Sequence, residues 1–322
     1  MRFKAKLAPE QVSLLYSVIV PLARLSSSAS ETSAWARNGS ILYMDSDRFS
    51  ISCKGRSQET DGISCFAEFR AAEGIFLEHR IESVAENNGI LMEIDLGQLK
   101  LALQSVCANS MNSSERGTIE AAYNLDERSA VFKLAKRNNM ACLCIEALSA
   151  SKIQVHHAVP VRILRVTDKQ QYMPPMIDDP TVKLQIVAPH QVQTRPLRTI
   201  LENMRTMETA RSTHPTVLVY GNQQSGELTI SLESEGASIR AYFADVAPAA
   251  TADPEKYECT VKVDARKLSA ALQWQQQPQY ISSALLGLLE NQQLILHVSL
   301  EPAGVGFFTY YVPVHYLSKE AD

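Results

Sequence analysis

Short segments in which polar and apolar residues alternate recur along the whole chain, which predicts a protein built mainly of β-strands. Alternation of this kind is typical of strands with one buried face. Asn-Gly and Ser-Asp pairs between several of the segments indicate turns between consecutive strands. We expect strands at 2–7, 40–45, 48–53, 62–69, 75–83, 90–95, 129–136, 140–148 and 152–163, and again at 181–189, 215–221, 226–234, 237–245, 256–264, 279–288, 292–300 and 305–314.

Apolar residues recur at helical spacing in four other segments, which we expect at 10–25, 96–107, 191–208 and 265–276. Pro9 suits a first helical turn, and Pro21 is expected to kink or shorten the first helix. Asp95 and Asp264 precede the second and fourth helices, where a carboxylate accepts hydrogen bonds from free backbone N–H groups. Their equivalent places at two helix starts favour capping over catalysis.

Three short motifs occur twice in the same order, which indicates an internal duplication. LAPEQV at 7–12 returns as VAPHQV at 187–192, and AVPVRIL at 158–164 returns as YVPVHYL at 311–317. Between them, MEIDLGQLKLALQ at 92–104 returns as VKVDARKLSAALQ at 261–273. The sequence therefore predicts two copies of one domain.

The order of elements is the same in each half, so we place the domains at 1–164 and 181–322, with an extended connector rich in Pro and Asp at 165–180. Short turns between consecutive strands predict antiparallel sheets, with two helices on one face in each domain. This arrangement is an α+β fold. Segments 26–39 and 108–128 have weak periodicity, and we expect loops there.

Composition and motifs exclude several classes of protein. Of the 322 residues, 45% are apolar and 20% charged, which excludes a wholly disordered chain, and the net charge of −4 excludes a broadly basic coat for nucleic acid. No apolar run approaches the ~20 residues of a membrane-spanning helix, and the first residues lack a signal-peptide core, so we expect a soluble intracellular protein.

Signatures of catalysis and metal binding are missing as well. The six cysteines form no C-x-x-C pair and have no histidine at zinc spacing, so we expect reduced, buried thiols. His156 and His157 are adjacent on a strand and point to opposite faces, so they cannot share a metal. GxSxG, the P-loop, GxGxxG and HExxH do not occur. We expect no enzyme activity, cofactor or metal, and a hydrolase built from dispersed residues is the least favoured alternative.

Basic side chains gather on the helix faces opposite the apolar stripes. The helix 191–208 carries its arginines there, diluted by Glu202, and its counterparts add a few more cations. These faces are either ordinary solvated surfaces or a lining that contacts phosphates, and periodicity alone leaves both open. The cations are Arg24, Lys100, Arg195, Arg198, Arg205, Arg266 and Lys267.

Several segments together resemble the Hus-one subunits of the nine-one-one DNA-damage checkpoint clamp, a branch of the PCNA-like sliding-clamp family. The likeness covers about 1–318. It is carried by MRFKAK at the start, EIDLGQLKLALQS at 93–105, SKIQVHHAVPVRIL at 151–164, PPMIDDPTVKLQI at 174–186 and VDARKLSAALQ at 263–273. The resemblance implies a ring of three different two-domain chains that encloses duplex DNA, with strands outside and helices facing the hole.

The resemblance also implies three sets of site residues. The helix cations above would face DNA, although the first half contributes only Arg24 and Lys100. Edges of the strands 152–163 and 237–245 would pair with neighbouring subunits, through Val155, His157, Val159, Ile239, Ala241 and Phe243. The connector would border a pocket for partner peptides, through Tyr172, Met173, Pro174, Met176 and Ile177.

The implied function is that of a non-enzymatic scaffold in the nucleus. The implied partners are two other clamp subunits, double-stranded DNA, a loader of the replication-factor-C type, and repair enzymes at the connector. The chief alternative is a homotrimeric, PCNA-type replication clamp.

Overall fold

The computed structural model describes residues 1–27, 40–55, 57, 60–71, 74–111, 129–148, 154–187, 196–208, 215–234, 237–244, 246–249 and 257–317. The chain divides into two compact units. Unit 1 comprises Met1–Cys53, Phe66–Pro174 and Gly304–Gly306, and unit 2 comprises Lys54–Cys65, Pro175–Ala303 and Phe307–Asp322. The chain passes from the main segment of one unit to that of the other inside the predicted connector.

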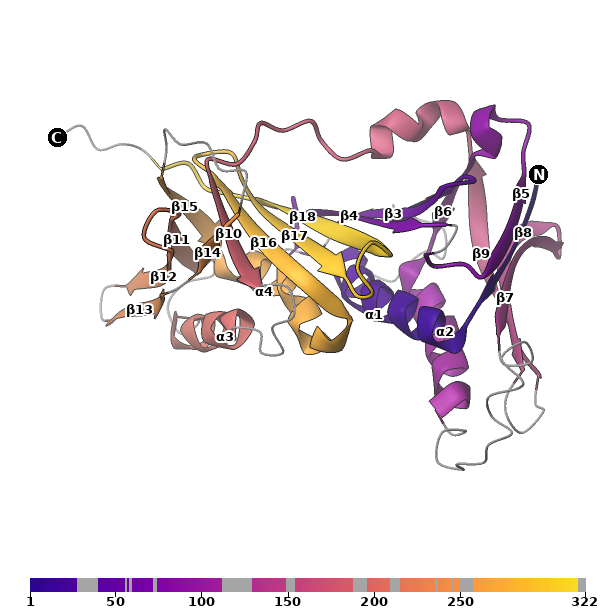
Figure 1. Cartoon of the computed structure of the whole chain (residues 1–322), viewed down its shortest axis with the longest axis horizontal. Coiled ribbons are helices and arrows are strands. Elements are labelled where there is room, and N and C mark those ends of the chain that lie inside the picture. The colour runs from indigo at the N-terminus through magenta and orange to yellow at the C-terminus, as the bar shows by residue number, and fades with distance from the viewer. Residues whose placement is uncertain are drawn as a thin grey trace. The chain divides into compact units, whose positions relative to one another are not determined.

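Unit 1 is a strongly bent antiparallel sheet with two helices against it (Figure 1). Its strands follow the order β4-β3-β2-β6-β9-β8-β7-β1-β5. Alternate residues of β1, among them Phe3 and Ala5, are buried, and the helices contact each other and the buried face. The elements are β1 (Arg2–Leu7), α1 (Pro9–Ser26), β2 (Ser40–Met44), β3 (Arg48–Lys54), β4 (Ser64–Arg70), β5 (Glu78–Glu82), η1 (Glu86–Asn88), β6 (Ile90–Ile94), α2 (Leu96–Met111), β7 (Ala130–Arg137), β8 (Met140–Leu148) and β9 (Gln154–Leu164).

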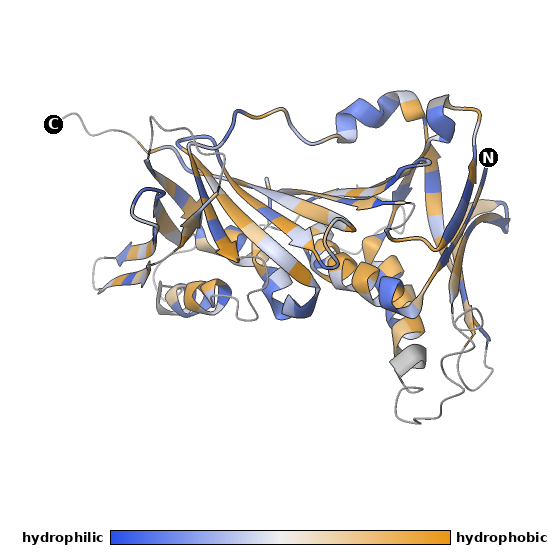
Figure 2. Cartoon of the chain, viewed as in Figure 1, coloured by the Kyte–Doolittle hydropathy of each residue, from blue (hydrophilic) through white to orange (hydrophobic). Residues whose placement is uncertain are grey.

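Unit 2 contains two antiparallel sheets, in the orders β14-β10-β16-β17-β18 and β13-β12-β11-β15, and its helices α3 and α4 contact each other. Alternating exposure along β11 and β17 reproduces the alternation of the sequence (Figure 2). The elements are β10 (Val182–Val187), α3 (Leu197–Glu208), β11 (Thr216–Asn222), β12 (Glu227–Ser234), β13 (Ala237–Phe243), β14 (Ala247–Pro248), β15 (Glu258–Asp264), α4 (Ala265–Ala271), η4 (Gln273–Gln276), η5 (Pro278–Tyr280), β16 (Ile281–Leu289), β17 (Gln293–Leu300) and β18 (Gly306–Pro313).

The predicted α+β class is therefore confirmed, and the described residues of each unit include two α-helices. The domain ranges 1–164 and 181–322 remain a prediction, because the compact units exchange short segments. All six cysteines are described, buried and outside any disulfide, as expected of apolar fillers. Among the described residues, no helix is both long and apolar enough to cross a membrane.

The first helix, expected at 10–25, is α1, and it continues past Pro21 to Ser26. The ends of two other helices differ from expectation. The helix α2 runs on to Met111, although a loop was expected from 108. The helix α4 ends at Ala271 and is followed by 3₁₀ turns, since 3₁₀ winding is common at helix ends and Pro278 cannot continue a helix. The first part of the helix expected at 191–208 lies outside the described residues.

We expected an extended connector at 165–180, but only part of it is extended. Its first part forms the 3₁₀ helix η3 (Val166–Tyr172). A 3₁₀ helix has three residues per turn, so Val166, Lys169 and Tyr172 share one face. Val166 and Tyr172 pack against the buried cluster of Ile41, Tyr43 and Leu91 in unit 1. This packing gives the segment a reason to wind, and the residues beyond it stay extended.

Candidate nucleic-acid interface

Two aspartates lie at the N-termini of α2 and α4, which carry three of the predicted DNA-facing cations. Asp95 Oδ1 accepts hydrogen bonds from Gly97 N at 2.7 Å and Gln98 N at 3.2 Å. Asp264 Oδ1 accepts one from Arg266 N at 2.8 Å. Both residues cap their helices, as predicted, and thereby fix where α2 and α4 begin.

Arg266 is held by the cap of its own helix. Its Nη2 lies 3.1 Å from Asp264 Oδ2, and its side chain is only 14% exposed. Burial by itself raises the pKa of Asp264, but the hydrogen bonds and positive charge of Arg266 outweigh it, so the pKa lies below the ordinary value. The guanidinium is therefore committed to an internal ion pair and has little freedom to follow a phosphate.

Arg198 is held in a similar way between α3 and α4. Its Nη2 donates to Glu202 Oε1 at 2.8 Å, and Ser269 Oγ donates to the same carboxylate at 3.1 Å. Arg198 N donates to Gln275 Oε1 at 3.1 Å. This network ties α3 to α4 and the turn after it, and it engages the Arg198 guanidinium inside unit 2.

The other cations expected to face DNA differ in their surroundings. Arg205 on α3 and Lys267 on α4 are half-exposed, and within the described part of the chain neither side chain has an ion pair. Lys100 on α2 is half-exposed, and Arg24 in the last turn of α1 is exposed. Arg195 lies outside the described residues. Arg198 and Arg266 are thus largely buried in ion pairs, whereas the other four described cations are half-exposed or exposed.

Of the two strands expected to close a ring, β13 is an edge strand of the described structure, whereas β9 lies between β8 and β6 and has a free edge only along part of its length. Along β13 the residues pair with β12, and no second strand of the described residues pairs with it. In β9, 154–160 pair with β8, and only 161–164 pair with β6 on the other side. The side chains expected at these edges are half-buried, except for the buried Val159 (Val155, His157, Ile239, Ala241 and Phe243).

Of the residues expected to form a peptide pocket, Tyr172 is packed in the fold, and most of those after it are exposed. Tyr172 is packed on unit 1, whereas Met173 and Pro174 are exposed, and Met176 is completely exposed. Ile177 is half-buried. The connector therefore presents an exposed apolar segment directly after an anchored one.

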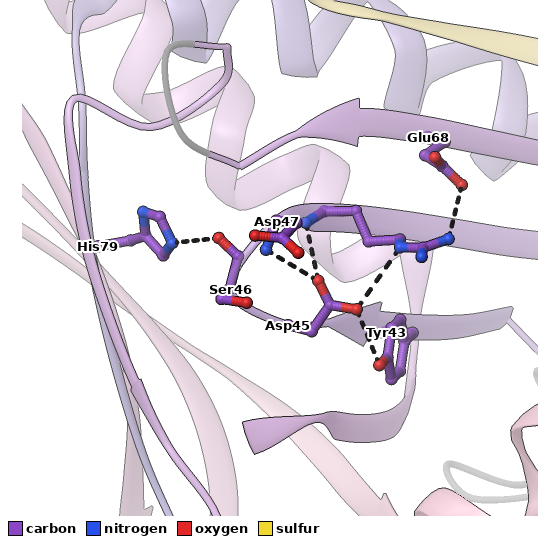
Figure 3. Close-up of polar contacts among 7 residues, drawn as sticks. Tyr43, Asp45, Ser46, Asp47, Glu68 and His79 are labelled. Atoms are coloured by element: carbon purple, nitrogen blue, oxygen red, sulfur yellow. Dashed lines mark hydrogen bonds and ion pairs between the residues drawn. The ribbon is translucent and has the colours of Figure 1, made fainter. Parts of the chain in front are cut away.

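Sequence reasoning missed the group that anchors the connector. Lys169 Nζ lies 3.6 Å from the centroid of the Tyr43 ring. The Tyr43 hydroxyl donates to Asp45 Oδ2 at 2.9 Å (Figure 3). Burial, together with this hydrogen bond and the charge of Asp45, raises the pKa of Tyr43 to about 12. Spacing of three between Val166, Lys169 and Tyr172 is the sequence signal that would have indicated the anchor.

The turn between β2 and β3 holds the aspartate that positions Tyr43. Asp45 is 5% exposed, and its Oδ1 accepts hydrogen bonds from Asp47 N and Arg48 N, both at 2.9 Å. Arg48 Nε lies 3.5 Å from Asp45 Oδ2, and Nη1 lies 4.0 Å from Glu68 (Figure 3). The buried carboxylate is thus fully partnered, which is the condition for placing a charge there at small cost.

Comparison with known proteins identifies relatives along the whole chain. The family model described as Hus1-like protein matches residues 1–315. The checkpoint protein HUS1 of Homo sapiens is 23% identical over 259 residues, which are 77% of this chain and 80% of that protein.

Solved structures give the fold. PCNA from Thermococcus kodakaraensis matches with a TM-score of 0.59 and 10% identity, over 97% of this chain and all of that one. The PCNA2–PCNA3 complex from Sulfolobus tokodaii matches with a TM-score of 0.57 and 10% identity, over 97% of this chain and 99% of that one. The predicted PCNA-like clamp fold is confirmed.

Proposed function

The chain belongs to the Hus1-like family, and we propose that it is a non-enzymatic subunit of a heterotrimeric checkpoint clamp. The observation that carries this proposal is the match of the family along residues 1–315, which includes both compact units. The chain would act in the nucleus, assembled with two other clamp subunits around double-stranded DNA. Checkpoint kinases and repair enzymes would use the ring as a scaffold.

Ring closure is proposed to use the free edges of β9 and β13. A strand with an unpaired edge presents N–H and C=O groups that a second strand can complete. Pro160 lies within β9 and cannot donate a hydrogen bond, which is tolerated at an edge. Because such edges are prone to pair wrongly, the chain produced alone should be monomeric or poorly soluble.

DNA contact is proposed to come from the cations that are open to solvent. Long, flexible side chains near phosphates hold a duplex without reading its sequence, as a sliding ring requires. With about four such contacts, log affinity should fall with log salt at a slope of roughly −3 to −4. A loader driven by ATP would open the ring, and the connector beyond Tyr172 would engage peptides of repair enzymes.

Co-expression with two candidate clamp subunits tests the proposal directly. We expect a complex with one copy of each chain, measured by light scattering after gel filtration. It should remain on nicked circular DNA at high salt and leave when the circle is cut. A stable closed trimer of this chain alone would instead support the homotrimeric, PCNA-type alternative.

The connector has its own test. Ile177→Asp should weaken binding of repair-enzyme peptides to the assembled ring, and Gln170→Ala, in the anchored part, serves as the control. Unchanged affinity for Ile177→Asp removes the connector from the peptide site.

A further inference from the structure

Three cations face one another across neighbouring strands of unit 1. In the pairing of β1 with β5, Lys4 lies opposite Arg80, and in the pairing of β1 with β7 it lies opposite Lys133. Residues directly opposite each other in a sheet point to the same face, about 5 Å apart. We name Arg80, Lys4 and Lys133 the cation row. Like charges in such positions destabilise a sheet, so folding alone gives no reason for the row.

The cation row lies on the face of the sheet that the helices do not cover. Phe3 and Ala5, on either side of Lys4 in β1, are buried, as is Phe132 beside Lys133. The helices α1 and α2 contact this sheet (Figure 1), and burial identifies the face of these residues as the covered one. Lys4 itself is exposed, and the Arg80 side chain is 78% exposed. The row is therefore open to solvent on the side away from the proposed DNA-facing helices.

Carboxylates pair with the two cations at the ends of the row but not with the cation at its centre. Arg80 pairs with Glu82, and Lys133 Nζ lies 2.6 Å from Glu146 Oε1. The pKa of Glu146 is lowered, first by its hydrogen bond with Lys133. Lys4, at the centre, has no ion pair within the described ranges of the chain.

The whole face carries a positive excess, although the chain has a net charge of −4. On β1, β5, β7 and β8, six cations share it with three carboxylates. They are Arg2, Lys4, Lys6, Arg80, Lys133 and Arg137, with Glu78, Glu82 and Glu146.

We propose that the cation row is a docking site for an acidic segment of a protein partner. The carboxylates on both sides of the row would repel the continuous line of phosphates on a duplex, but they leave room for a peptide with spaced charges. Side chains on one face of an extended peptide recur about every 7 Å, within reach of flexible lysines in neighbouring strands. Met140 and Leu148, 42% and 39% exposed on the same face of β8, offer apolar contacts beside the row.

The test uses the full chain in its assembled ring and a fluorescein-labelled peptide of twelve residues that alternates Glu and Ser. Its counterpart with Gln in place of Glu has the same length and no charge. We expect the acidic peptide to bind and the neutral one not to. Lys4→Glu should weaken binding about tenfold in dilute salt, as reversing one charge about 5 Å from a carboxylate does in water. Lys54→Glu changes an exposed cation elsewhere and should have no effect.

Three results would overturn the proposal: no binding of the acidic peptide, equal binding to the unaltered chain and Lys4→Glu, or equal losses of peptide and duplex DNA binding. The last result would identify the row as a nucleic-acid surface. Lys4→Gln should also raise the midpoint of thermal unfolding, because it removes the repulsion at the centre of the row, and a lower midpoint contradicts that premise. Ring size is measured on each sample, so a failure of assembly is distinguished from a failure of docking.

Discussion

Arg205 and Arg198 lie on the same helix, yet their loss should affect DNA binding very differently. Arg205 has no internal ion pair among the described residues, whereas Arg198 is held by Glu202 at 2.8 Å. Arg205→Ala should therefore remove one phosphate contact from the assembled ring. Arg198→Ala should leave DNA binding nearly unchanged and instead loosen the contact between α3 and α4.

The magnitude follows from counterion release. Each phosphate contact contributes about −0.9 to the slope of log affinity against log salt. Arg205→Ala should make the slope shallower by about 0.9 and weaken binding about tenfold at 50 mM salt. Arg198→Ala should not change the slope. Its effect should be a loss of about 1 kcal/mol in the free energy of unfolding, typical of a partly buried charged hydrogen bond.

A third variant should change the salt dependence of DNA binding in the opposite direction. Glu202→Gln releases Arg198 and removes a carboxylate from the same helix face, so the slope should become steeper by about 0.9. Fluorescence anisotropy of a labelled duplex between 50 and 200 mM salt measures all three slopes on assembled rings. If Arg198→Ala weakens binding as much as Arg205→Ala, the internal ion pair does not withhold Arg198 from DNA, and the reasoning fails.

Three further predictions concern the units themselves. The pKa of Asp264 is depressed in the folded chain, so its stabilisation is present above the unfolded value of about 4 and is lost as pH falls through the folded pKa. Asp264→Asn, which keeps the cap, should cost about 2 kcal/mol at pH 7 and progressively less as the pH falls below about 4, as urea unfolding across this range would show; a cost that does not change with pH contradicts the ion pair. Lys169→Ala removes the contact with Tyr43 and should speed amide exchange in Val166–Tyr172 about fivefold, and an unchanged rate would show that the contact does not anchor the connector. On α2, Leu103→Ala should cost about 3 kcal/mol and Leu101→Ala, 61% exposed, less than about 0.5, and similar costs in urea unfolding would contradict the orientation of the helix.

Local sequence patterns were sufficient to predict most helices and strands and some residues of the candidate site. Alternation predicted every described strand except the two-residue β14 within two or three residues, because a half-buried strand must repeat its apolar positions every second residue. Asp95 and Asp264 were recognised as caps from their place before an apolar helical pattern, since a cap bonds only to the next few residues. The duplication predicted that both halves share one plan.

Which groups meet across the fold was decided by tertiary structure. Helical spacing placed Arg198 on a polar face, but nothing local shows that Ser269, from another helix, shares its carboxylate partner. The same holds for Lys169 above Tyr43, and for Lys4 between Arg80 and Lys133. The physical reason is range: periodicity and capping depend on neighbours along the chain, whereas strand register and burial depend on residues that only packing brings together.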